Sequence, residues 1–159
     1  MKKTLISTLF SIMLLSLFFS GCKKKNVDGD IVVPEETKPY SFIKINGDEY
    51  VFENYLCMYS SLAGKYRVTR ELSNDNDNVL FKLVAKNQDG SNITGATLVT
   101  DSENITMTIK FLDVNYNVQP QTELKVYQDS PVVFYATSSG IAVSEDASMT
   151  INYELGYVN

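Results

Sequence analysis

Apolar and polar side chains alternate along most of the chain after residue 40, and this period of two constrains the fold more than any other feature. The clearest stretch is 104–112, where the odd positions are apolar (Ile105, Met107, Ile109 and Phe111). Strict alternation of this kind indicates a half-buried β-strand. No segment shows a sustained helical period of 3.6, so the sequence predicts an all-β fold.

Similar segments recur at spacings of about 8–12 residues with turn signals between them, which is typical of a β-sandwich or barrel. They predict eight to nine antiparallel strands, at 40–45, 49–60, 65–72, 79–86, 93–100, 104–112, 124–127, 132–137 and 148–158. Asn46-Gly47 is the clearest hairpin signal, because both positions favour positive φ. We expect a loop at 115–121, with a short helix at 113–118 as the alternative.

An antiparallel β-sandwich is the predicted architecture, because the strand lengths are uneven and several strands carry aromatic residues on both faces. A lipocalin-like β-barrel is the alternative, since positions that line a barrel lumen look like core positions in a sequence.

The first 22 residues predict where the protein is located. Lys2-Lys3 precede a mostly apolar run at 5–19, and Ser20-Gly21-Cys22 and three lysines follow. The run is shorter than the roughly 20 residues of a membrane-spanning helix, but it suits the apolar region of a secretory signal. We therefore predict a lipoprotein signal peptide over 1–21, with Cys22 as the lipidated residue. An ordinary cleaved signal with a coincidental cysteine is the alternative.

The rest of the chain divides into a tether and a domain. Residues 22–39 combine charge, Gly and Pro without an apolar period, which is typical of a flexible tether, and 40–159 is expected to be a single domain.

Composition limits the possible binding partners. Removal of 1–21 leaves 12 Lys and Arg against 19 Asp and Glu, a net charge of −7. Nucleic-acid binding depends on a basic surface. We therefore expect no nucleic-acid partner, and a membrane contact through Cys22.

Residues that carry out catalysis in other proteins are missing or scattered. The chain has no His, which removes the commonest general base and a common metal ligand. It also lacks a Gly-x-Ser-x-Gly elbow, a Gly-rich phosphate loop and a recognisable carboxylate pair. We therefore predict a non-enzymatic protein without a cofactor. Cys57, in an apolar strand pattern, is expected to be a buried small hydrophobe rather than a reactive thiol.

Asp75 and Asp77 are a metal candidate within the polar loop 73–78. Their spacing, with amide oxygens nearby, is similar to the first half of a calcium loop. No Gly follows for the sharp turn, and no Glu closes the site. A solvated hairpin tip explains the same residues by turn chemistry.

The ten tyrosines include the candidate ligand-binding residues. A tyrosine offers a large contact area and a hydroxyl at low entropy cost, so it suits recognition of a glycan or a protein. The candidates are Tyr50, Tyr55, Tyr59 and Tyr66. The alternative is that tyrosines simply fill half-buried β surfaces, for which they have high propensity.

The start Cys22-Lys23-Lys24-Lys25 and the segment Phe42-x-x-x-Asn46-Gly47-x-x-Tyr50 resemble small Bacteroidota lipoproteins of unknown function. The resemblance covers the signal well and the domain loosely. It implies a β-sandwich or lipocalin-like body on the cell envelope, at the outer membrane and facing the surface or the periplasm. We expect an envelope-anchored module that binds a glycan or a protein partner. A carrier of a small apolar ligand and a structural envelope component are the alternatives.

Overall fold

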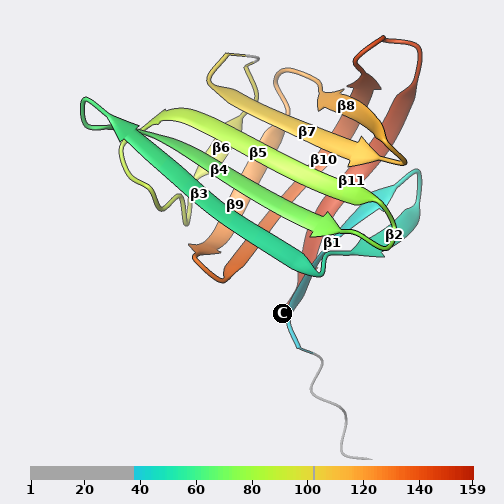
Figure 1. The fold of residues 1–159 in the computed structure, drawn as a ribbon, viewed down its shortest axis with the longest axis horizontal. Coiled ribbons are helices and arrows are strands. Elements are labelled where there is room, and N and C mark those ends of the chain that lie inside the picture. The colour runs from blue at the N-terminus through green and yellow to red at the C-terminus, as the bar shows by residue number, and fades with distance from the viewer. Residues whose placement is uncertain (1–37, 102) are drawn as a thin grey trace, which may run out of the picture. The chain divides into compact units, whose positions relative to one another are not determined.

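The computed structural model describes residues 38–101 and 103–159, which contain eleven β-strands and no helix (Figure 1). The expected signal peptide, Cys22 and nearly all of the expected tether lie outside these residues. The prediction of an antiparallel all-β fold is confirmed. The strands are β1 (Tyr40–Ile45), β2 (Asp48–Val51), β3 (Asn54–Leu62), β4 (Lys65–Asn74), β5 (Val79–Gln88), β6 (Thr97–Val99), β7 (Ile105–Phe111), β8 (Val114–Val118), β9 (Glu123–Ser130), β10 (Val133–Ser144) and β11 (Thr150–Val158).

All eleven strands belong to one antiparallel sheet that curls into a half-barrel. Nine strands follow the order β2-β1-β11-β10-β8-β7-β5-β4-β3, while β9 pairs with β10 and β6 pairs with β9. In Figure 1 the green and yellow strands β3, β4, β5 and β7 cross in front of the orange and red strands β9, β10 and β11. The two layers face each other as in a sandwich, but pairing through β8 and β10 joins them as in a barrel.

The hairpin between β1 and β2 forms as its turn residues predict. Asn46 has a φ of 52° and Gly47 a φ of 101°, and Ile45 pairs with Asp48, which leaves two residues in the turn. Positive φ at both central positions gives the turn a twist that matches the flanking strands.

The core lies between the two layers. Large apolar side chains at alternate strand positions point into it from both sides, and those from the front layer include Phe81, Leu83 and Ile109. The back layer contributes Leu124, Phe134 and Leu155 among others. Burial of each such side chain contributes about 1.5–3 kcal/mol, so the alternating pattern is the main source of stability.

Three expected elements differ in the structure. The strand predicted at 49–60 is divided, because the chain changes partner at its middle: the Phe52 amide donates to the Ser41 carbonyl and the Glu53 amide to the Ser73 carbonyl. The loop or helix predicted near 113–121 contains strand β8, which pairs with β7 and β10. The strand predicted at 93–100 is reduced to the three residues of β6.

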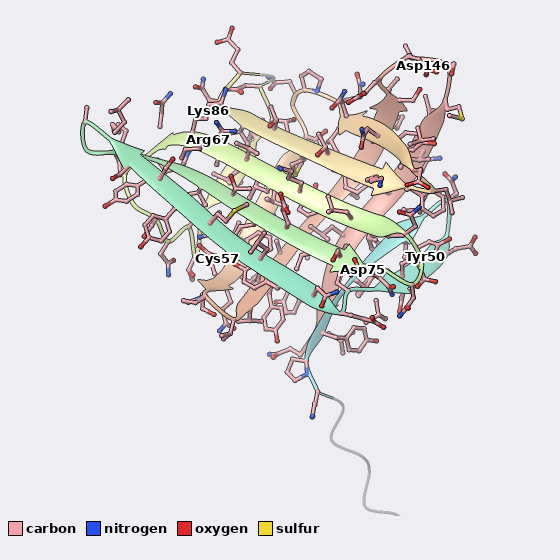
Figure 2. All side chains as sticks on the ribbon, in the orientation of Figure 1. Tyr50, Cys57, Arg67, Asp75, Lys86 and Asp146 are labelled. Atoms are coloured by element: carbon pink, nitrogen blue, oxygen red, sulfur yellow. The ribbon has the colours of Figure 1, made fainter. Side chains whose placement is uncertain are left out.

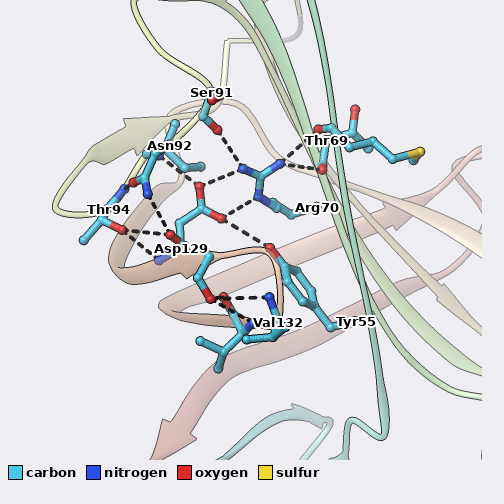
Figure 3. Close-up of polar contacts among 12 residues, drawn as sticks. Tyr55, Thr69, Arg70, Ser91, Asn92, Thr94, Asp129 and Val132 are labelled. Atoms are coloured by element: carbon cyan, nitrogen blue, oxygen red, sulfur yellow. Dashed lines mark hydrogen bonds and ion pairs between the residues drawn. The ribbon is translucent and has the colours of Figure 1, made fainter.

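A buried ion pair joins β4 in the front layer to β9 in the back layer (Figure 3). The Arg70 guanidinium binds the Asp129 carboxylate through two bonds, Nε–Oδ1 at 2.6 Å and Nη2–Oδ2 at 2.7 Å. The other Arg70 N–H groups donate to the carbonyls of Met58, Thr69 and Ser91. Both side chains are almost fully buried, and all five guanidinium donors are used.

Asp129 also holds the loop before β6 and a tyrosine of β3. Its Oδ2 accepts the Ile93 amide at 2.9 Å, and its Oδ1 accepts the Tyr55 hydroxyl at 3.2 Å. Thr94 Oγ1 accepts the Asp129 amide at 2.8 Å. Burial is the main cause that raises the pKa of Tyr55 well above its ordinary value, so this tyrosine remains a hydroxyl donor. We call Arg70, Asp129 and Tyr55 the interlayer clamp.

Asp101 gives the turn before β7 a pH dependence. Its Oδ1 accepts the amides of Asn104 at 2.7 Å and Ile105 at 2.8 Å, and these bonds lower its pKa to about 2. A depressed folded-state pKa adds stability above the unfolded value of 3.8, and this stability is lost as the pH falls through about 2. We expect Asp101→Asn to destabilise the protein near neutral pH, and the difference from the wild type should shrink as the pH falls toward about 2. Urea unfolding of both proteins at several pH values measures this, and a pH-independent difference contradicts it.

Candidate ligand-binding groove

A groove opens on the outer surface where two neighbouring strands separate. β10 and β11 pair from Ser138–Leu155 to Val143–Thr150. On the N-terminal side of Ser138, β10 pairs with β9 instead. On the C-terminal side of Leu155, β11 remains paired with β1. The space between the separated strands is an open groove of about 560 Å³. Its lining residues are Phe42, Glu123, Lys125, Thr137, Ser138, Ser139, Glu154, Leu155, Gly156 and Tyr157.

One wall of the groove is the ring of Phe42, which lies over Gly156 on the neighbouring strand. The two residues are direct partners in the β1–β11 ladder. A Cβ atom at position 156 would lie 2.5 Å from Phe42 Cζ, so only glycine leaves room for the ring in this position. The Lys44 ammonium lies 5.3 Å from the centre of the same ring.

The other wall is the ring of Tyr157, which contacts two further tyrosines behind the lining. The Tyr157 ring stacks on Tyr135 with the ring centres 5.1 Å apart, and it meets Tyr127 at 5.2 Å in a tilted arrangement. Tyr127 is half exposed and lies at the irregularity where the β9–β10 register shifts. A β-bulge redirects side chains and is common beside binding sites.

The floor of the groove is held by buried hydroxyl groups. Ser138 Oγ donates to the Glu123 carbonyl at 2.8 Å and lies 2.9 Å from the Tyr153 hydroxyl. Burial raises the pKa of Tyr153 to about 12. The floor is therefore uncharged at physiological pH and is fixed to three strands.

Charges on the rim are paired. Lys125 lies 3.3 Å from Glu123, and Lys44 lies 3.9 Å from Glu154. Thr137 and Ser139 add hydroxyl groups to the lining. The groove thus combines aromatic faces with hydrogen-bonding groups, and each charged residue of its lining has an oppositely charged partner. Such a surface suits a neutral ligand that has both apolar and hydroxyl faces.

The four tyrosines predicted from the sequence do not form one surface. Tyr50 is half-buried against Phe111, with the ring centres 5.4 Å apart, and Tyr55 belongs to the interlayer clamp. Tyr59 and Tyr66 meet at 6.2 Å at the far end of β3. The tyrosine that lines the groove is Tyr157 of β11, and the tyrosines in contact with it come from β9 and β10. Gly156 in the middle of an alternating strand was the one sequence signal for the groove, since glycine there often marks close approach of another group.

Asp75 and Asp77 lie in the turn between β4 and β5. The Asp77 amide donates to Asn74 Oδ1 at 3.0 Å, and Asn54 Nδ2 donates to Asp75 Oδ2 at 3.4 Å. Within residues 38–101 and 103–159, no three Cys, Asp or Glu side chains come together as metal ligands would. Turn geometry accounts for both aspartates.

Cys57 is only half-buried, which corrects the prediction of a fully buried thiol. It lies on β3, which among the described strands has a neighbour only on its β4 side. A residue on such an edge strand loses the cover that a second neighbouring strand would give.

The fold and the groove define the protein as an antiparallel all-β module with an aromatic-walled surface site. No known protein family matches the chain, and no curated protein or solved structure is detectably similar to it. Among the residues that the structure describes, no helix is long and apolar enough to cross a membrane.

We expect Gly156→Ala to displace the Phe42 ring, because the new Cβ would overlap it. Forced repacking of this kind costs about 1–3 kcal/mol, and the ring is only half-buried, which favours the lower value. Urea unfolding gives the cost, and NMR shifts of the Phe42 ring report its movement. Gly140→Ala is the matched control, since its nearest neighbour would lie at an ordinary 3.5 Å. Equal effects of the two substitutions would contradict the prediction.

Proposed function

We infer that the chain is an envelope-anchored lipoprotein whose β domain is a non-enzymatic module that binds a neutral glycan. The observation that carries this inference is the groove with Phe42 and Tyr157 as walls and paired charges on its rim. A sugar ring has apolar C–H faces that pack on an aromatic ring and hydroxyl groups that hydrogen-bond to carboxylates and hydroxyls. The aromatic walls and the polar rim offer both kinds of contact.

The proposal of an envelope location rests on the sequence. The apolar run at 5–19, the small residues before Cys22 and the lysines after it support cleavage and lipidation at Cys22. Attachment through more than one acyl chain would give stable anchoring. The domain would then be held at the outer membrane, facing the surface or the periplasm.

A carrier of a small apolar ligand is a second candidate, favoured by a pocket of about 380 Å³ at β7 and β8. Its lining includes Ile105, Met107, Val118 and Pro120. The space between the two layers is filled by the core side chains, so this smaller surface pocket is the support for a carrier.

Binding of neutral oligosaccharides on a glycan array tests the proposed function. We expect saturable binding that changes little with salt, because the ligand is uncharged. Tyr157→Ala and Glu154→Ala should each weaken it by at least about tenfold, or about 1.4 kcal/mol. Tyr59→Ala is the matched control, since Tyr59 is an exposed tyrosine outside the groove. Failure to bind any glycan, or equal loss in the control, would refute the proposal.

Protease digestion of intact cells tests the location. Digestion of the domain would place it on the surface, and protection until the envelope is opened would place it in the periplasm. Cys22→Ala should release the domain from the membrane fraction or leave an uncleaved precursor. A correctly processed variant that remains in the membrane would refute lipid anchoring.

A further inference from the structure

The edge strand β3 is long and carries none of the features that normally prevent pairing with another chain. Asn54–Leu62 pairs along its length with β4 and is the last strand of the sheet that residues 38–101 and 103–159 form. Its nine residues include no charged residue and no proline. Natural edge strands are usually short, charged or interrupted by proline. The edge strands β2 and β6 follow this rule, with four and three residues, and β2 begins with Asp48 and Glu49.

Large apolar side chains on β3 are exposed to solvent. The exposed fractions are 47% for Leu56, 42% for Met58, 63% for Tyr59 and 84% for Leu62. Single exposed apolar residues are common, but a cluster on one strand with an unpaired backbone edge marks an interaction site. An incoming strand would bind the backbone edge by hydrogen bonds and the exposed side chains by apolar contact.

The sequence of β3 is complementary to itself when two copies run antiparallel with their two-fold axis at Cys57. Leu56 of one copy then lies opposite Met58 of the other, and Tyr55 lies opposite Tyr59. Apolar and aromatic cross-strand pairs stabilise a sheet by about 0.2–1 kcal/mol each. A two-fold axis makes every such pair occur twice.

Charges at the two ends of β3 favour the same antiparallel arrangement. Glu53, Asp75 and Asp77 lie near its first residue, where Asn54 bonds Asp75. Lys65, Arg67 and Lys86 line a hollow with Leu62 at its other end, where Asp89 pairs with Lys65. Figure 2 shows Asp75 toward one end and Arg67 and Lys86 toward the other, with Cys57 between them. Antiparallel pairing brings the acidic end of one copy to the basic end of the other, whereas parallel pairing brings like charges together.

We propose that β3 is a dimerisation edge, through which two copies of this chain pair antiparallel about Cys57 and extend one sheet across both molecules. The second copy is the occupant because the strand matches its own sequence in this register and its end charges complement one another. The dimer surface is separate from the groove, whose lining residues come from other strands.

The dimer is tested by measuring the molecular mass of the full chain in mild detergent. Light scattering after size-exclusion chromatography gives this mass. We expect a dimer for the wild type and at least about tenfold weaker association for Leu56→Lys, which puts a charge on the edge. Ile141→Lys is the control, because Ile141 is an exposed apolar residue on β10, which does not pair with β3. Circular dichroism and the melting temperature confirm that each variant is folded. A monomeric wild type, or a Leu56→Lys variant that dimerises as well as the wild type, overturns the proposal.

Disulfide cross-linking under mild oxidation tests the register. Opposed residues in an antiparallel pair have Cα atoms about 4.5–5.5 Å apart, within the range that a disulfide spans. Cys57 should therefore form a cross-linked dimer, and Cys57→Ser reveals any contribution of Cys22. In the Cys57→Ser background, a mixture of Leu56→Cys and Met58→Cys chains should cross-link better than either alone. A dimer that fails both cross-linking tests overturns the proposed register.

Discussion

Replacement of Asp129 by alanine should lower the free energy of unfolding by about 3–5 kcal/mol. The change leaves the Arg70 guanidinium almost fully buried without its charged partner, and it removes the acceptor for the Ile93 amide. Breaking one side of a buried ion pair is costly for this reason. Urea unfolding followed by circular dichroism measures the loss, and hydrogen exchange should show faster exchange in the loop before β6.

A double replacement separates the cost of a broken pair from the value of an intact one. Arg70→Met combined with Asp129→Leu removes both charges and keeps much of the buried volume. Apolar replacement of a buried ion pair is often neutral or stabilising, so the double variant should be more stable than Asp129→Ala alone. A loss below about 1 kcal/mol for Asp129→Ala would show that water or a neighbouring group compensates Arg70.

Phe134→Ala should lower the free energy of unfolding by a similar amount, about 3–5 kcal/mol. Phe134 is 1% exposed and projects from β10 into the space between the layers. Its ring lies parallel to that of Tyr55 on β3, with the centres 6.2 Å apart. Truncation removes most of the apolar contact and leaves a cavity between two layers that the clamp prevents from closing.

The neighbouring residue on the same strand provides the control for Phe134. Tyr135 is half-buried and stacks on Tyr157, so Tyr135→Ala should cost clearly less by urea unfolding while it removes a contact that supports Tyr157. Equal losses for the two substitutions would show that β10 does not separate core from surface by alternation.

The fold was predictable where a local pattern determines it. Ile105, Met107, Ile109 and Phe111 mark β7, and Asn46-Gly47 marks the first hairpin, because alternation and turn chemistry depend on neighbours in the sequence. The division between β2 and β3 was not predictable in this way. It results from hydrogen bonds to Ser41 and Ser73, which are distant in the sequence.

The candidate groove and the clamp were missed because both depend on strand partners. Phe42 meets Gly156 only when β1 pairs with β11, and the groove forms where β10 leaves β11. Arg70 falls on the same face as Val68 and Leu72 in the alternating segment 65–72, and a charge at an inward position is a signal for a buried partner. The sequence did not identify that partner, since Asp129 lies 59 residues further along the chain.

The pairing of β1 with β11 also bears on how fast the sheet is completed. Tyr40 pairs with Val158 and Ile45 with Tyr153, so these contacts close a loop that contains nearly all of the described chain. Closing such a loop costs entropy before any contact repays it, and folds rich in long-range pairs reach the native state slowly. After synthesis, β1 and β2 can form their hairpin early. They acquire their place in the sheet only when the last strand has arrived.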